Sequence, residues 1–262
     1  MNKIEIGLQM YTVRDRINTL DDLKDTLNKI DKIGIKLLQM GVPGYLQPRE
    51  FKNLLDGYGM KMDCVGFPFG GDAAQVEQTL KYAELFGTNL VQTGSIPGEY
   101  RADADGYKRY AEKLNIDGAA LAAEGLKYIY HFHAFEFVTF GNIRGIDILL
   151  NETEKANVYF IPDVFWLTSA GVEPSSALKM FEGRTEWIHA KDYAILQLEG
   201  IIESVPYCFA PVGSGNLNWD GILKTSLDMG VYEFIIEQDQ CQEDVFLSVS
   251  KSFNFLKSKL NI

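Results

Sequence analysis

Short apolar runs alternate with amphipathic stretches along the whole chain, and this alternation restricts the fold more than any other feature of the sequence. Strands that are separated by helices lie parallel, because each crossover returns the chain to the same edge of the sheet. Eight such units in roughly 250 residues match the size of a (β/α)8 barrel. The sequence therefore predicts one α/β domain over residues 1–262, a (β/α)8 TIM barrel, with a doubly wound open sheet as the competing architecture.

The individual elements follow from hydrophobic spacing and from residues typical of helix ends. In the first helix Leu23 and Leu27 lie four positions apart, Thr19 is a plausible N-cap and Gly34 ends the helix. We expect strands at residues 4–9, 36–40, 61–67, 89–93, 126–133, 158–163, 187–191 and 234–237. We expect helices at residues 20–33, 48–58, 72–86, 103–124, 143–151, 174–181, 219–229 and 244–260.

Charge and cysteine content exclude several classes of protein. The 36 acidic residues outnumber the 25 basic ones, and a net charge of -11 repels the phosphates of a nucleic acid. The three cysteines show no C-x-x-C spacing, which is typical of reduced thiols. No signal peptide is visible, and no apolar run approaches the roughly 20 residues of a membrane-spanning helix. We therefore expect a cytoplasmic protein without nucleic-acid or membrane partners. The oligomeric state stays open, a homo-oligomer included.

Polar side chains gather where the predicted strands end, which is where parallel barrels carry their chemistry. All three histidines of the chain lie at such ends. The residues at these positions are Gln9 and Tyr11, Gln39, His131 and His133, Asp163, His189 with Lys191 and Asp192, and Glu237 with Asp239.

These residue types suit a mixed nitrogen and oxygen site for a divalent metal ion, with Mn²⁺, Zn²⁺ and Co²⁺ favoured over Ca²⁺ and Mg²⁺ as a further candidate. Asp163 lies in an apolar run, where a carboxylate is costly unless it is paired or bound to metal, and Glu237 follows the apolar residues 234–236. His131 and His133 share one strand face. A plain hydrogen bond across the barrel mouth explains either histidine equally well.

Two further features have a functional and a structural interpretation. The segment Gly213-Ser214-Gly215-Asn216 precedes the seventh helix, and loops after strands seven and eight often hold phosphate in this architecture. A tight turn explains the same glycines at least as well. Trp166 is one of several aromatic residues near strand ends that either line a sugar pocket or belong to the core.

Six segments together carry a family resemblance. They are the opening residues 6–14, the Y-H-F-H-A-F-E-F run at 130–137, the P-D-V-F-W and A-G-V-E-P pieces within 162–174, I-H-A-K-D at 188–192, G-S-G with the later Trp219, and E-Q-D at 237–239. The chain resembles, nearly end to end, the sugar phosphate isomerase/epimerase family of xylose isomerase-like TIM barrels.

The resemblance implies a divalent metal held by a Glu, an Asp, a His and a second Glu from strands five to eight. Asp163, His189 and Glu237 match the last three of these ligands. The Glu of strand five is absent, and His131 takes its place.

Three further positions depart from the family pattern. Phe132 stands where the family often has Asn, Ala134 stands where it often has Asp, and Gln39 lies on strand two where related enzymes often carry an acid. We expect these departures to change the catalytic acid–base pair and to leave the fold as it is in the family.

The family chemistry implied is isomerisation or epimerisation of a sugar or sugar phosphate through an enediolate that the metal stabilises. Glu237 is then the base, His131 its acid–base partner, and Lys191 stabilises the oxyanion or binds a phosphate. Further substrate contacts are expected from His133, Trp166 and Gln39.

Three other functions compete with this interpretation. A metal-dependent lyase or dehydratase acting on a keto-sugar or glycoside begins with the same proton abstraction, and His131 in place of a glutamate favours it. A non-catalytic sugar-binding barrel is compatible with the loss of paired acids. A DNA-repair endonuclease of the same superfamily needs many histidines and a basic surface, which this chain lacks.

Overall fold

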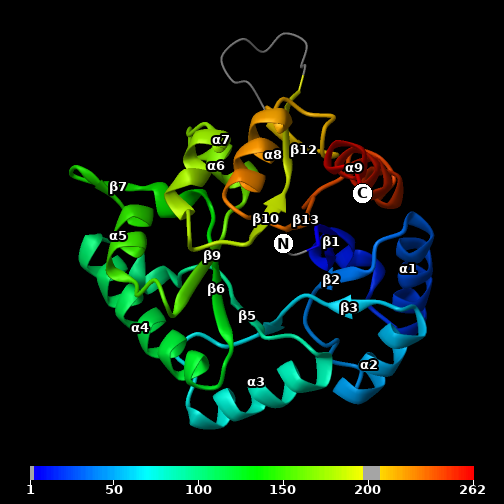
Figure 1. Cartoon of the computed structure of the whole chain (residues 1–262), viewed down its shortest axis with the longest axis horizontal. Coiled ribbons are helices and arrows are strands. Elements are labelled where there is room, and N and C mark those ends of the chain that lie inside the picture. The colour runs from blue at the N-terminus through cyan, green and yellow to red at the C-terminus, as the bar shows by residue number, and fades with distance from the viewer. Residues whose placement is uncertain (1–2, 197–206) are drawn as a thin grey trace.

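The computed structural model describes residues 3–196 and 207–262, and in this part of the chain parallel strands form a central ring with helices around it (Figure 1). The (β/α)8 barrel predicted from the sequence is confirmed. Its strands are β1 (Glu5–Gln9), β2 (Leu37–Gln39), a third strand in two pieces β3 (Lys61–Met62) and β4 (Val65–Gly66), β5 (Leu90–Thr93), β6 (Lys127–His131), β9 (Val158–Ile161), β10 (Trp187–Ala190) and β13 (Glu233–Ile236).

The ring has two places where the ladder of hydrogen bonds is thin. Between β9 and β10 a single parallel bridge joins Asp163 to His189. The third strand, expected to be continuous over residues 61–67, is interrupted at Asp63 and Cys64. The prediction is wrong there because β3 pairs with β2 whereas β4 pairs with β5, so the strand changes partner at the break.

The helices that cover the barrel are α1 (Leu20–Ile33), α2 (Pro48–Gly57), α3 (Ala73–Phe86), α4 (Ala104–Ala123), α5 (Gly145–Glu152), α7 (Pro174–Ala177), α8 (Trp219–Asp228) and α9 (Val245–Leu260). The predicted ends of α1 are confirmed, since the Thr19 side chain accepts a hydrogen bond from the backbone N–H of Asp22 and Gly34 adopts a φ of 104°. The helix expected at 174–181 is instead a short α-helix followed by a 3₁₀ turn.

Elements absent from the sequence prediction lie in the loops. They are the helix α6 (Val164–Ser169), the antiparallel pair β11 (Asp192–Ile195) and β12 (Tyr207–Ala210), the hairpin β7 (Thr139–Phe140) and β8 (Ile143–Arg144), and 3₁₀ turns at Met10–Arg16, Gly98–Tyr100 and Ala134–Phe137. The hairpin takes up residues 143–144, which were expected to begin the fifth helix.

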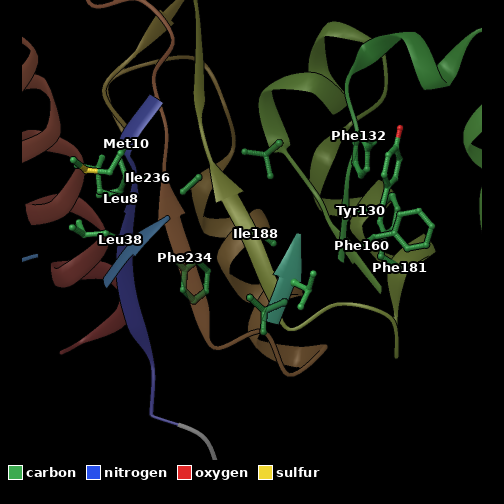
Figure 2. Packing of buried hydrophobic residues seen from close by; sticks show 14 of the residues in the cluster. Leu8, Met10, Leu38, Tyr130, Phe132, Phe160, Phe181, Ile188, Phe234 and Ile236 are labelled. Atoms are coloured by element: carbon green, nitrogen blue, oxygen red, sulfur yellow. The ribbon is translucent and has the colours of Figure 1, made fainter. Parts of the chain in front are cut away.

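Successive side chains of each strand point alternately out of and into the barrel, which produces two apolar layers. Outward-facing residues such as Leu8, Phe160 and Phe234 pack in the large core cluster that includes residues of the surrounding helices (Figure 2). Inward-facing residues fill the barrel itself: Leu37, Cys64, Leu90, Ile129, Ile161, Trp187 and Ile235. None of the helices in the described residues is long and apolar enough to cross a bilayer.

The next inward position along most strands is polar, which puts a polar layer above the apolar interior. This layer comprises Gln9, Gln39, Gln92, His131, Asp163, His189 and Glu237. The fold therefore concentrates the chemistry-bearing side chains at the carboxyl end of the barrel.

Candidate metal centre

Four buried side chains meet at the carboxyl end of the barrel. His131 ends β6, Asp163 follows β9, His189 lies on β10 and Glu237 follows β13. One potential ligand atom from each lies within 4.8 Å of the other three. The sequence predicts that these residues converge, and the structure brings all four together.

The four atoms that face one another have no hydrogen-bond partner in the described residues. They are His131 Nε2, Asp163 Oδ2, His189 Nδ1 and Glu237 Oε2. His189 Nδ1 lies 2.8 Å from Glu237 Oε2, but the contact does not have hydrogen-bond geometry. Buried polar atoms without partners are costly. Two nitrogens and two oxygens at this spacing fit a divalent ion such as Mn²⁺, Zn²⁺ or Co²⁺.

Asp163 divides its two carboxylate oxygens between the fold and the site. Oδ1 accepts hydrogen bonds from the backbone N–H groups of Phe165 at 2.9 Å and Trp166 at 3.1 Å, and so caps the N-terminus of α6. Oδ2 lies 3.5 Å from His131 Nε2 and 3.9 Å from His189 Nδ1. The cap fixes the carboxyl group so that the other oxygen points at the histidines.

Lys191 is buried beside the four residues and pairs with three carboxylates. Its Nζ lies 3.5 Å from Asp163 Oδ2, 3.6 Å from Glu237 Oε1 and 2.8 Å from Asp239 Oδ1. Three carboxylates against one ammonium leave two negative charges uncompensated when all are ionised. One divalent cation would balance them.

The pKa shifts agree with this distribution of charge. Burial disfavours ionisation of Asp163 and Glu237, but Lys191 and the neighbouring histidines together outweigh it and hold the pKa of both carboxyl groups below the usual range. Burial and the nearby His189 lower the pKa of His131. A neutral imidazole keeps the lone pair that a metal requires.

His133 and Trp166 lie beside the four residues, as expected for substrate contacts. Their rings are 5.3 Å apart, and the buried atoms His133 Nδ1 and Trp166 Nε1 have no hydrogen-bond partner among the described residues. Burial and the adjacent His131 lower the pKa of His133 to about 4, so its imidazole is neutral near pH 7. Both side chains can hydrogen-bond hydroxyl groups of a ligand, and their role stays a prediction.

Gln39 reaches the site from behind His189. Its Oε1 lies 2.7 Å from His189 Nε2, and its Nε2 donates a hydrogen bond of 2.7 Å to Asp63 Oδ2. Both ends of the amide are thus occupied inside the protein. These contacts favour support of His189 over the substrate contact expected from the sequence.

Residues 27–257 match the family model described as xylose isomerase-like TIM barrel. The chain belongs to this family.

Individual relatives of this xylose isomerase-like barrel differ in their described activities. An inosose dehydratase from Clostridium perfringens is 27% identical over 184 residues, which cover 66% of this chain and 61% of that protein. A sugar phosphate isomerase/epimerase from Parabacteroides distasonis superposes with a TM-score of 0.80 at 19% identity, covering 98% of this chain and 95% of that one. A xylose isomerase-like barrel from Mycobacterium smegmatis in complex with magnesium gives a TM-score of 0.72 at 16% identity, covering 99% and 98%.

The departures of this xylose isomerase-like barrel at positions 132 and 134 leave the four-residue cluster intact. Phe132 faces outward and stacks on Phe181 with ring centroids 5.1 Å apart. Ala134 begins a 3₁₀ turn that is held by the buried Glu136, which accepts hydrogen bonds from the backbone N–H of His133 at 2.9 Å and from the hydroxyl of Tyr130.

Two residues near the site were not assigned a role from the sequence. Asp239 contacts Lys191, and Glu136 orders the turn after His133. Both belong to segments that carry the family resemblance, E-Q-D and F-E-F, and Asp239 is also marked by its place at the end of the last strand.

The G-S-G loop forms a turn around a buried carboxylate. Asp192 Oδ2 accepts hydrogen bonds from the backbone N–H groups of Gly213 at 2.8 Å and Gly215 at 3.0 Å, and from Trp219 Nε1 at 2.8 Å. A side chain at position 215 would clash, because its Cβ would lie 2.4 Å from Asp192 Oδ1. Of the two interpretations of this loop, the tight turn agrees with these contacts.

Proposed function

We propose that this chain is a metal-dependent enzyme that removes the proton beside the carbonyl group of a polyhydroxylated substrate. His131, Asp163, His189 and Glu237 are the proposed ligands. The observation that carries the proposal is the set of four unpartnered ligand atoms within 4.8 Å of one another, next to two uncompensated negative charges.

Each neighbouring side chain has a distinct task in this reaction. A bound divalent ion would supply Lewis-acid polarisation of the carbonyl. Glu237 accepts the proton, since its carboxylate is ionised and its Oε1 faces Lys191 at 3.6 Å. The Lys191 ammonium stabilises the negative charge that develops on the substrate oxygen. His133 and Trp166 orient the substrate through its hydroxyl groups.

Elimination of water is the reaction that this arrangement favours. Glu237 takes the proton from the carbon beside the carbonyl, the electron pair of that C–H bond forms a new C=C bond, and the C–O bond on the next carbon breaks. The departing hydroxyl takes the proton back from the Glu237 carboxyl group and leaves as water, which returns Glu237 to its ionised form. This step needs only one group that takes and returns the proton, and the cluster holds the neutral His131 where the family has a second glutamate. The described activity of the Clostridium perfringens relative, inosose dehydratase, supports the same choice.

Isomerisation or epimerisation of a sugar is the second candidate. It requires a group that returns the proton; the unpartnered Nε2 of His131 is the candidate for that task, and His131 is then not a metal ligand. A non-catalytic sugar-binding barrel is disfavoured, because binding alone does not explain a buried cluster of ligand atoms. The amides of the G-S-G loop are occupied by Asp192, which favours a substrate without phosphate at that loop.

A deuterium exchange screen tests this proposal. The protein is incubated with Mn²⁺ in D₂O and a panel of cyclic polyhydroxy ketones, ketoses and their phosphates, and products are analysed by NMR and mass spectrometry. We expect loss of water from a cyclic or open-chain polyhydroxy ketone. An isomeric product with deuterium beside the carbonyl would instead establish the second candidate.

The control is the same protein after treatment with EDTA. Because the proposed chemistry depends on the ion, we expect the reaction to disappear and to return when Mn²⁺ is added in excess. A reaction that proceeds unchanged without divalent metal contradicts the proposal.

A further inference from the structure

A chain of buried polar side chains leads from the candidate metal centre into the barrel. His189 Nε2 contacts Gln39 Oε1 at 2.7 Å, and Gln39 Nε2 donates to Asp63 Oδ2 at 2.7 Å. Gln9 Nε2 also donates to Gln39 Oε1, at 2.8 Å. Gln39, Asp63 and Glu233 are only 2%, 4% and 8% exposed. Since water does not compete for these groups, their partners determine their orientation.

Asp63 contacts Gln39 from the break in the third strand. Beyond Gln39 its neighbour is Glu233, at the start of β13. Asp63 Oδ1 and Glu233 Oε2 accept no hydrogen bond from an amide or other N–H group in the described part of the chain. The two carboxyl groups lie close enough to share a proton in a hydrogen bond. Burial and the adjacent Asp63 raise the pKa of Glu233 to about 9, so Glu233 stays protonated and its hydroxyl donates a hydrogen bond to the Asp63 carboxylate.

The ionised Asp63 determines the direction of each hydrogen bond between it and His189. An ionised carboxylate only accepts hydrogen bonds, so the amide nitrogen of Gln39 must face Asp63. The carbonyl oxygen of Gln39 then faces His189 and accepts a hydrogen bond from Nε2–H. A neutral imidazole with its proton on Nε2 has a bare lone pair on Nδ1. That lone pair belongs to the atom that faces Asp163 and Glu237.

We infer that Asp63, with Gln39 and Glu233, is a positioning relay that fixes the tautomer of His189 and thereby prepares Nδ1 for a metal ion. The inference rests on the proposed metal site. Residues that orient a histidine ligand through its other nitrogen typically change metal affinity about 10- to 100-fold when they are replaced. The short contact between His189 Nδ1 and Glu237 Oε2 fits the inference, since a cation bound to both atoms would relieve the repulsion of two acceptors at 2.8 Å.

The test uses Asp63→Asn, which keeps the size of the side chain but can also donate a hydrogen bond. The Gln39 amide is then no longer held in one orientation, and His189 no longer has one enforced tautomer. We expect the affinity for Zn²⁺, measured by competition with a chelating dye, to fall about 10- to 100-fold. We also expect a new population of His189 with its proton on Nδ1, detected in metal-free protein at about pH 8 by long-range ¹H–¹⁵N correlation. Only three histidines contribute signals, and His189→Gln assigns the one of interest.

Two further variants separate the relay from a merely structural role. Glu233→Gln still donates to Asp63, so we expect Zn²⁺ affinity within about twofold of the parent. Combining Asp63→Asn with Gln39→Glu reverses the polarity of the middle bond, because the carboxylate introduced at position 39 accepts from both His189 and the new amide. We expect this double variant to regain the Nε2 tautomer and at least about tenfold in affinity over Asp63→Asn alone.

The relay is contradicted if Asp63→Asn leaves both the tautomer and the Zn²⁺ affinity unchanged. It is also contradicted if His189 in the metal-free parent carries its proton on Nδ1, a measurement that needs no variant to fold. Failure of the metal site is recognised separately: the parent then binds no Zn²⁺ in the competition assay, whereas the tautomer of His189 still reports on the relay.

Discussion

Replacing Glu237 by glutamine should lower turnover about 10²- to 10⁴-fold, the usual contribution of a general base. Glutamine keeps the size of the side chain and a carbonyl oxygen, but it cannot accept the proton from the substrate. The fold should be retained, because Glu237 lies at the barrel mouth above the packed interior. The measurement is the initial rate at saturating Mn²⁺ on the substrate that the deuterium screen identifies.

Glu182→Gln is the matched control for this substitution. Glu182 is exposed and follows the 3₁₀ turn at Leu178–Phe181, so its replacement should leave the rate unchanged. A Glu237→Gln rate within about twofold of the parent would show that Glu237 is not the base.

The substitution His131→Gln tests whether the imidazole at the end of β6 is a metal ligand or a second acid–base group. If His131 is only a ligand, excess metal should restore most of the rate. If it returns the proton to the substrate, the rate should stay low when the site is saturated with metal.

Replacing Lys191 by methionine should destabilise the metal-free protein by about 3–5 kcal/mol, the typical effect of removing one partner from a buried charge pair. The variant removes the ammonium that lies within 3.6 Å of the carboxylates of Asp163, Glu237 and Asp239. A divalent ion should restore part of the loss, because it meets a more negative site. Urea unfolding with EDTA and with Mn²⁺ measures both effects.

The pH dependence provides a signature of the same interaction. Lys191 lowers the pKa of Asp163 and Glu237 from their ordinary values of 3.8 and 4.5. Carboxyl groups with a depressed pKa stabilise the fold above the ordinary value, and this contribution is lost as the pH falls through the folded-state pKa. The difference in unfolding free energy between parent and Lys191→Met should therefore shrink as the pH falls below 4.5.

Lys224→Met is the control for the lysine substitution. Lys224 pairs with Asp228 on the surface of α8, where its side chain is 75% exposed. An exposed pair contributes about 1 kcal/mol or less. If Lys191→Met costs no more than Lys224→Met in the presence of EDTA, the charge arrangement described for the metal centre is wrong.

The barrel and the convergence of the four site residues could be predicted because both depend on local patterns. Alternating strands and helices define a parallel barrel, and its geometry brings the residues that follow the strands to one end. The sequence alone therefore identifies Asp163, His189 and Glu237 as candidates.

Features that depend on partners distant in the sequence were not predictable in this way. The apolar pattern of residues 61–67 continues across the break at Asp63, whereas its hydrogen-bonding partner changes from β2 to β5. The pairing of β11 with β12 joins segments on either side of residues 197–206, which lie outside the described part of the chain. The contact between Gln39 and His189 joins two strands that are 150 residues apart, so Gln39 was expected to face the substrate.

A crystal structure of the protein soaked with Mn²⁺, with diffraction recorded for the anomalous signal of manganese, tests the central claim most directly. We expect one strong anomalous peak about 2.0–2.3 Å from His131 Nε2, Asp163 Oδ2, His189 Nδ1 and Glu237 Oε2. The same crystals soaked with Mg²⁺ alone should show no anomalous peak there. A manganese peak bound by other residues, or none at saturating Mn²⁺, would contradict the account of this site.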